Sequence, residues 1–190
     1  MLGKRQEVYE ALMKRPEEYY NQLETRTLQA ILALLPPKPT SEVVISGFYP
    51  INSEIDCAFL LKRLISLGYR AALPVVTGRQ QPLLFRIWNG EDSNLVEAEF
   101  HTKIPHPRCA ECDPDVLLVP FLSFASNQMR LGYGGGYYDR TLTSLRARKQ
   151  VCAIGLGFAA QYLEETPFSA SDQPVDAVVT EEGEWTLPRS

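Results

Sequence analysis

The chain lacks features that mark membrane and secreted proteins. No apolar run approaches the roughly 20 residues that a membrane-spanning helix requires, and residues 1–15 are polar and amphipathic, unlike a secretory signal. Four cysteines in 190 residues are too few to indicate a secreted disulfide framework. These absences predict a cytoplasmic protein that does not bind membranes.

Zinc ligands are scarce as well. Cys109 and Cys112 have the spacing of a metal-binding pair, but a structural zinc site needs a second pair. Cys57 and Cys152 fall in separate predicted elements, so we interpret the four as unrelated thiols.

An excess of positive charge is also missing. The chain has 19 Lys and Arg against 23 Asp and Glu, a net charge of -4, and its arginines are dispersed. Nucleic-acid-binding proteins usually carry a basic stripe, so nucleic acid is not an expected partner. With no internal repeat and 45% hydrophobic residues, the sequence predicts one globular domain over residues 1–190 that acts as a monomer.

Apolar runs and helical periodicities alternate along most of the chain. Strands are predicted at 43–48, 71–76, 83–88, 95–99, 116–120, 151–156 and 177–180. Helices are predicted in an N-terminal segment (1–36) that packs on the sheet, from Ser53 to Gly68, and from Tyr137 onward. Residues 100–115 read as a polar, proline-bearing loop. The predicted fold is a single-domain, Rossmann-like α/β structure whose mostly parallel central sheet has helices on both faces.

Residues 130–140 read RLGYGGGYYDR and hold a third of the chain's 12 glycines. Glycines lack Cβ atoms, so their backbone amides can approach a phosphate without obstruction. The stretch follows a buried strand and precedes a helix, the position where α/β sheets bind anions. An ordinary turn needs one or two glycines, so we favour a phosphate-binding loop. It matches neither the P-loop nor the dinucleotide signature, which indicates a different phosphate-binding family.

This string resembles the signature of 5-formyltetrahydrofolate cyclo-ligases, also called 5,10-methenyltetrahydrofolate synthetases. Residues 49–56, 115–120 and 172–181 resemble further segments of that family in the expected order. The resemblance implies a magnesium-requiring reaction in which 5-formyltetrahydrofolate and ATP give 5,10-methenyltetrahydrofolate, ADP and phosphate. The formyl oxygen attacks the γ-phosphorus to form an imidate phosphate, and N10 then closes the ring and expels phosphate.

The resemblance also implies roles for individual residues. The residues expected at ATP are Lys4, Arg5, Arg130, Leu131, Gly132, Tyr133, Gly134, Gly135, Gly136, Tyr137 and Tyr138, of which Arg130 and Tyr138 are expected to be catalytic. The residues expected at the folate substrate are Tyr49, Ile51, Glu54, Asp56, Tyr133, Gly134, Gly135, Gly136 and Tyr137.

The candidate acidic residues have a functional interpretation, and most of them also have a structural one. Either Glu54 or Asp56 is expected to accept hydrogen bonds from the pterin, while Asp56 also fits a capping box with Ser53. Asp139 and Asp172 are expected to hold Mg²⁺ beside the phosphates. The alternatives are a carboxylate favoured by the helix dipole for Asp139 and a surface turn for Asp172.

The chain departs from the family pattern in two places. Ala125 and Gln128 stand where many members carry Asp and Gly, although Ser126 and Asn127 could build the turn through side-chain bonds to the backbone. The N-terminal Lys-x-x-Leu-Arg motif is not intact, with Lys4 or Arg5 in its place. These departures motivate a second hypothesis, a catalytically silent relative that binds nucleotide or folate as a sensor or partner-binding protein.

Overall fold

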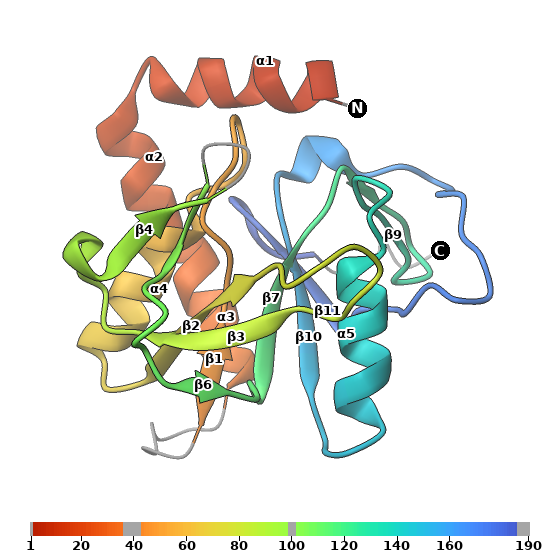
Figure 1. The fold of residues 1–190 in the computed structure, drawn as a ribbon. Coiled ribbons are helices and arrows are strands. Elements are labelled where there is room, and N and C mark those ends of the chain that lie inside the picture. The colour runs from red at the N-terminus through yellow and green to blue at the C-terminus, as the bar shows by residue number, and fades with distance from the viewer. Residues whose placement is uncertain (1, 36–42, 99–101, 186–190) are drawn as a thin grey trace.

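A central eight-stranded sheet organises the molecule (Figure 1). The computed structural model describes residues 2–35, 43–98 and 102–185. The strand order is β12-β11-β10-β7-β1-β2-β3-β6, with parallel pairing from β11 to β2 and antiparallel strands at the two sides. The strands are β1 (Val44–Ser46), β2 (Arg70–Val75), β3 (Leu84–Trp88), β6 (Glu111–Cys112), β7 (Val116–Pro120), β10 (Cys152–Leu156), β11 (Ala177–Thr180) and β12 (Gly183–Glu184).

Each face of this sheet is covered by helices and carries its own hydrophobic core. Adjacent residues of β7 point to opposite faces: Leu118 joins the core with α4 (Cys57–Ser66) and α3 (Leu28–Leu34), and Leu117 joins the core with α5 (Tyr137–Arg146). The two leucines are completely buried. Burial on both faces explains why the central strands read as continuous apolar runs.

The N-terminal segment is helical throughout most of its length. Helix α1 (Leu2–Met13) is followed by α2 (Pro16–Gln22), where Pro16 occupies the first turn and its missing N–H costs nothing. A π-helical turn (Leu23–Thr27) leads into α3, and the Thr27 hydroxyl donates to the carbonyl of Thr180 in β11 at 2.9 Å. Helix α1 lies across one end of the molecule, at the top of Figure 1.

The predicted start of the helix that follows β1 needs a correction. Helix α4 begins at Cys57 rather than Ser53, and Asp56 is its N-cap, because the Asp56 carboxylate accepts from the amide of Phe59 at 2.9 Å. The capping box with Asp56 as third helical residue is therefore wrong. An aspartate directly before an apolar run caps a helix as well as a serine does.

The predicted loop 100–115 is also wrong in part, because it contains two short strands. Strand β5 (Lys103–Pro105) pairs with β4 (Leu95–Glu97), and β6 pairs with β3 at the sheet edge. Strand β5 forms a hairpin with β4, whereas the partner of β6 lies far back in the sequence, and both strands are too short to give a clear alternating pattern. Residues 36 and 99–101, which belong to predicted elements, lie outside the described residues.

Smaller elements complete the chain. They are the hairpin of β8 (Ser123–Phe124) and β9 (Arg130–Leu131), and two 3-10 turns, Asp92–Asn94 and Ala159–Gln161. Within the described ranges, no helix is long and apolar enough to cross a bilayer.

Candidate active site

The glycine loop lies between β9 and helix α5, which begins at Tyr137 as predicted. Gly134 and Gly136 have φ angles of 84° and 61°, a region that favours glycine. Among the described residues, no acceptor takes a hydrogen bond from the amides of residues 132–136. The loop therefore meets the geometric requirement of a phosphate site, and its ligand stays a prediction.

The altered turn before this loop still forms. The amide of Gln128 donates to the carbonyl of Ala125 at 3.1 Å, and the amide of Ala125 donates to the carbonyl of Met129 at 3.0 Å. The Asn127 side chain accepts from the amide of Met129 at 3.1 Å, which is the kind of bond that the sequence suggested. Gln128 has a φ of 65°, so it adopts the left-handed conformation that glycine takes most readily.

A buried polar cluster joins α1, the segment after β1 and the glycine loop. The Arg5 guanidinium donates to the Ser53 hydroxyl at 3.1 Å and to the Tyr133 hydroxyl, and lies 3.7 Å from the Glu54 carboxylate. The Tyr133 hydroxyl in turn donates to the same Glu54 oxygen at 3.1 Å. Arg5 is 1% exposed, and so is buried at the predicted site, whereas Lys4 beside it is exposed.

Glu54 needs this cluster because it is only 6% exposed. Burial raises the pKa of Glu54, while the amide of Ile51 (2.9 Å), the Arg5 charge and the Tyr133 hydroxyl oppose that rise. Burial, followed by the charge on Glu54, raises the pKa of Tyr133 to about 12. The tyrosine therefore keeps its proton near neutral pH and acts as a donor to the carboxylate.

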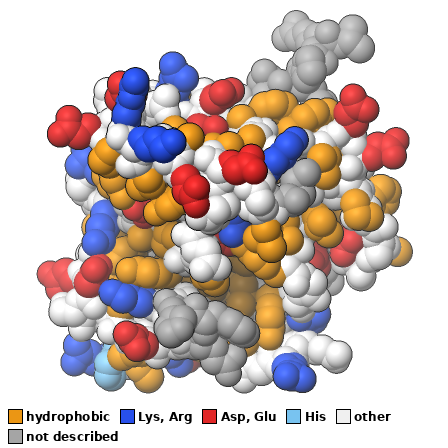
Figure 2. Space-filling view, turned by 90° about the horizontal axis from the view of Figure 1, so that it is seen from above, with side chains coloured by type: hydrophobic (Ala, Val, Ile, Leu, Met, Phe, Trp, Pro, Cys, Tyr) orange, Lys and Arg blue, Asp and Glu red, His pale blue; other side chains and the backbone are white. Residues whose placement is uncertain are grey.

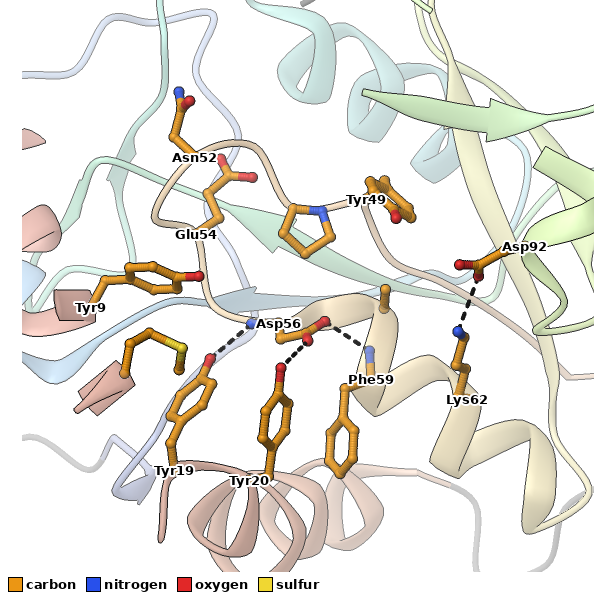
Figure 3. Close-up of a pocket in the computed structure, with 13 residues that line it drawn as sticks. Tyr9, Tyr19, Tyr20, Tyr49, Asn52, Glu54, Asp56, Phe59, Lys62 and Asp92 are labelled. Atoms are coloured by element: carbon orange, nitrogen blue, oxygen red, sulfur yellow. Dashed lines mark hydrogen bonds and ion pairs between the residues drawn. The ribbon is translucent and has the colours of Figure 1, made fainter. Parts of the chain in front are cut away.

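The structure distinguishes the two acids that the sequence could not. Glu54 faces Arg5 and the glycine loop, whereas Asp56 caps α4 and accepts from the Tyr20 hydroxyl at 3.0 Å. The two acids line a pocket of about 430 Å³ together with Tyr49. Figure 3 shows these side chains around it, and Figure 2 shows the hollowed face at this end of the molecule. Glu54 is the better placed of the two for the predicted pterin.

The predicted charges at the phosphate position are paired with each other. The Arg130 guanidinium lies 2.9 Å from Asp139 and donates to the carbonyl of Gln173 at 2.6 Å. The amide of Gln173 also donates to Asp139, at 3.1 Å. Asp172 accepts a hydrogen bond from the amide of Ser169 at 2.7 Å, a bond typical of the surface turn that was the alternative interpretation of this residue.

These carboxylates suit a cation held mainly by a nucleotide. The described ranges contain no group of three His, Cys, Asp or Glu that could hold a metal. Asp139 and Asp172 each keep one carboxylate oxygen without a hydrogen bond to a described residue. Because Mg²⁺ often takes one or two protein carboxylates and completes its shell with phosphates and water, the donor set fits.

The remaining predicted residues surround the loop. Leu131 pairs with Ser123 in the β8–β9 hairpin. The Arg140 guanidinium carbon lies over the Tyr137 ring, 5.3 Å from the ring centroid. Tyr138 packs against the α5 core, and burial raises the pKa of its hydroxyl, with smaller effects from Cys57 and Glu54. Tyr138 therefore lies in the first turn of α5, directly after the glycine loop, and its ring contributes to the packing of that helix.

Sequence reasoning missed three participants. Tyr19 and Tyr20 reach the Asp56 region from α2, and Ser53 holds Arg5 rather than starting a helix. Adjacent tyrosines in an otherwise polar helix were the available signal.

Comparison with known proteins identifies the family. A model of the 5-formyltetrahydrofolate cyclo-ligase family matches residues 4–181. The 5-formyltetrahydrofolate cyclo-ligases of Mycolicibacterium smegmatis and Escherichia coli K12 are 33% and 30% identical, over 72% and 74% of this chain and 72% and 79% of theirs.

Solved structures agree with this result. An NMR structure of Aquifex aeolicus 5,10-methenyltetrahydrofolate synthetase has a TM-score of 0.68 and 26% identity, covering 100% of this chain and 95% of that one. A Mycoplasma pneumoniae 5,10-methenyltetrahydrofolate synthetase, at 23% identity and a TM-score of 0.66 over 95% and 98%, shares the fold. The predicted fold class and ligase class are confirmed. The chain belongs to the 5-formyltetrahydrofolate cyclo-ligase family.

Proposed function

We propose that this protein converts 5-formyltetrahydrofolate to 5,10-methenyltetrahydrofolate and, in the same reaction, ATP to ADP and phosphate. One observation carries the proposal: Tyr133 belongs to the glycine loop, and its hydroxyl contacts the buried carboxylate of Glu54. A phosphate held by the loop and a pterin held by Glu54 would therefore meet at one place. Proximity of two reactants is the main contribution that phosphoryl transfer asks of a protein.

The chemistry assigns a task to each group. The amides of residues 132–136 hold the γ-phosphate, and the formyl oxygen attacks its phosphorus while the bond to the ADP oxygen breaks. N10 then attacks the formyl carbon, loses its proton to solvent and displaces phosphate. Glu54 orients the pterin by accepting its N–H groups, and Tyr138 stands beside the reacting atoms.

Charge neutralisation comes from nearby cations. Arg5 and Arg130 supply positive charge. Arg5 does so by leaving the Glu54 carboxylate and binding a phosphate oxygen instead. Asp139 and Asp172 would hold Mg²⁺, which neutralises charge on the phosphates when it is bound. We further propose that the protein acts as a cytoplasmic monomer, with no nucleic acid or membrane partner.

The test mixes purified protein with 5-formyltetrahydrofolate, ATP and Mg²⁺ and follows methenyl-folate absorbance together with ADP release. The proposal expects equimolar methenyl product and ADP. A working positive control with no product from this protein would reject it.

A second candidate function has its own observation. Gln128 replaces a turn glycine, and Arg130 is paired with Asp139 rather than facing open solvent. A silent relative that binds nucleotide or folate as a sensor would show calorimetric binding of ATP or 5-formyltetrahydrofolate without ADP release. Measurable turnover eliminates this candidate.

A further inference from the structure

The pocket beside Glu54 continues beyond the position proposed for the pterin. Five of its 13 lining residues are aromatic, and four of these come from helices: Tyr9 from α1, Tyr19 and Tyr20 from α2, and Phe59 from α4. Flat aromatic walls favour a flat aromatic ligand. A volume of about 430 Å³ lies within the usual range for small-molecule sites. The pocket therefore has room for more of the substrate than its pterin.

A cation stands at the other end of this pocket. Figure 3 shows Glu54 at one side and Lys62 with Asp92 at the opposite side. Lys62 lies on the second turn of α4, six residues after Asp56, which is about 9 Å along a helix axis. Its ammonium group is 3.0 Å from Asp92 and 5.7 Å from the Trp88 ring centroid.

The Lys62–Asp92 pair can exchange partners easily. The two side chains are 46% and 54% exposed, and an exposed ion pair contributes little to stability. A carboxylate arriving through the pocket would replace Asp92 at the ammonium group without leaving a buried charge unpaired. Asp92, in turn, would remain solvated by water.

We propose that Lys62 is a specificity-determining residue that binds a carboxylate of the substrate's glutamate tail, with Asp92 as its competitor. This inference rests on the proposed function. A folate carries a pterin, an aromatic aminobenzoyl group and a tail with carboxylates, in that order. The pocket presents an acid, aromatic walls and a cation in the same order.

The experiment compares 5-formyltetrahydrofolate with 5-formyltetrahydropteroate, which lacks the glutamate. Lys62→Ala should raise KM for the first substrate about two- to fivefold, the worth of an exposed ion pair, and leave KM for the second unchanged. The kcat for each substrate should not change. Asp92→Asn should lower KM for the glutamate-bearing substrate.

Arg63→Ala is the matched control. Arg63 neighbours Lys62 on α4 but pairs with Glu24, 2.6 Å away, and does not line the pocket. It should not distinguish the two substrates. An equal KM change for both substrates in Lys62→Ala, or no change for either, overturns the inference.

Failure of the proposed function is distinguishable from failure of this inference. If the wild-type protein turns over neither substrate, calorimetry decides the inference instead. Lys62→Ala must then weaken the binding of 5-formyltetrahydrofolate and leave the binding of 5-formyltetrahydropteroate unchanged. If wild type and variant bind each ligand with equal affinity, the inference about Lys62 is rejected.

Discussion

Replacement of Arg5 by methionine tests the buried cluster that joins the two halves of the site. Methionine keeps much of the side-chain length and fills the space, but it removes the counter-charge of Glu54. Arg5 and Glu54 are 1% and 6% exposed, so the lost pair is a buried one. Removing one partner of a buried ion pair typically costs about 3–5 kcal/mol. We expect about 3 kcal/mol at pH 8, because Glu54 keeps the bonds from Ile51 and Tyr133.

The cost should depend on pH in a defined direction. The pKa of Glu54 is already raised by burial, and Arg5 opposes that rise, so the Arg5→Met substitution raises the pKa further. The pKa of Glu54 in the folded protein lies above its value of 4.5 in the unfolded chain. The contribution of Glu54 to folding stability is therefore fully present below pH 4.5 and is lost as pH rises through the folded pKa. The destabilisation of Arg5→Met should therefore grow between pH 5 and pH 8.

Urea unfolding at pH 5, 6.5 and 8 measures this difference for wild type, Arg5→Met, Glu54→Gln and the double variant. The double variant removes both charges, so it should recover stability relative to Arg5→Met at pH 8 and show little pH dependence from this site. A pH-independent cost for Arg5→Met, with additive effects in the double variant, would refute the reasoning.

Three further predictions follow from single residues. Asp139→Asn should raise the Mg²⁺ concentration for half-maximal turnover, as a Mg²⁺ titration measures, and an unchanged titration would remove Asp139 from the metal site. Gln128→Gly should raise the free energy of unfolding by up to about 1 kcal/mol. The substitution relieves about 1–2 kcal/mol of left-handed strain, which exceeds the entropic cost of glycine, about 0.5–1 kcal/mol. A lower urea midpoint for the variant would contradict this. Asp56→Ala should cost about 1 kcal/mol through loss of the α4 cap, whereas Asp56→Asn should cost little, and equal losses in urea unfolding would reject the capping role.

The sequence predicted the parts of the fold that follow from local patterns. Strand β7 was visible as an apolar run because both its faces are buried, and α5 was visible because Leu142 and Leu145 share one buried face. Strands β5 and β6 were not visible, because β5 is a three-residue arm of a hairpin with β4 and β6 is a two-residue strand whose partner, β3, lies far back in the sequence.

The candidate site shows the same division. Glycines in the loop were predicted from their density, and the structure leaves their amides unbonded to described residues. The burial of Arg5 against Glu54 could not be predicted, because 49 positions in the sequence separate the two residues that the fold brings within 3.7 Å. The Arg130–Asp139 pair likewise depends on how β9, the loop and α5 turn in space.

The most direct test of the account is a single-turnover measurement with wild-type protein, γ-labelled ATP, 5-formyltetrahydrofolate and Mg²⁺. The account predicts that labelled phosphate and 5,10-methenyltetrahydrofolate form in equal amounts and that neither forms when the other substrate is omitted. Phosphate release that is independent of the folate, or methenyl-folate formation without ATP, would contradict it.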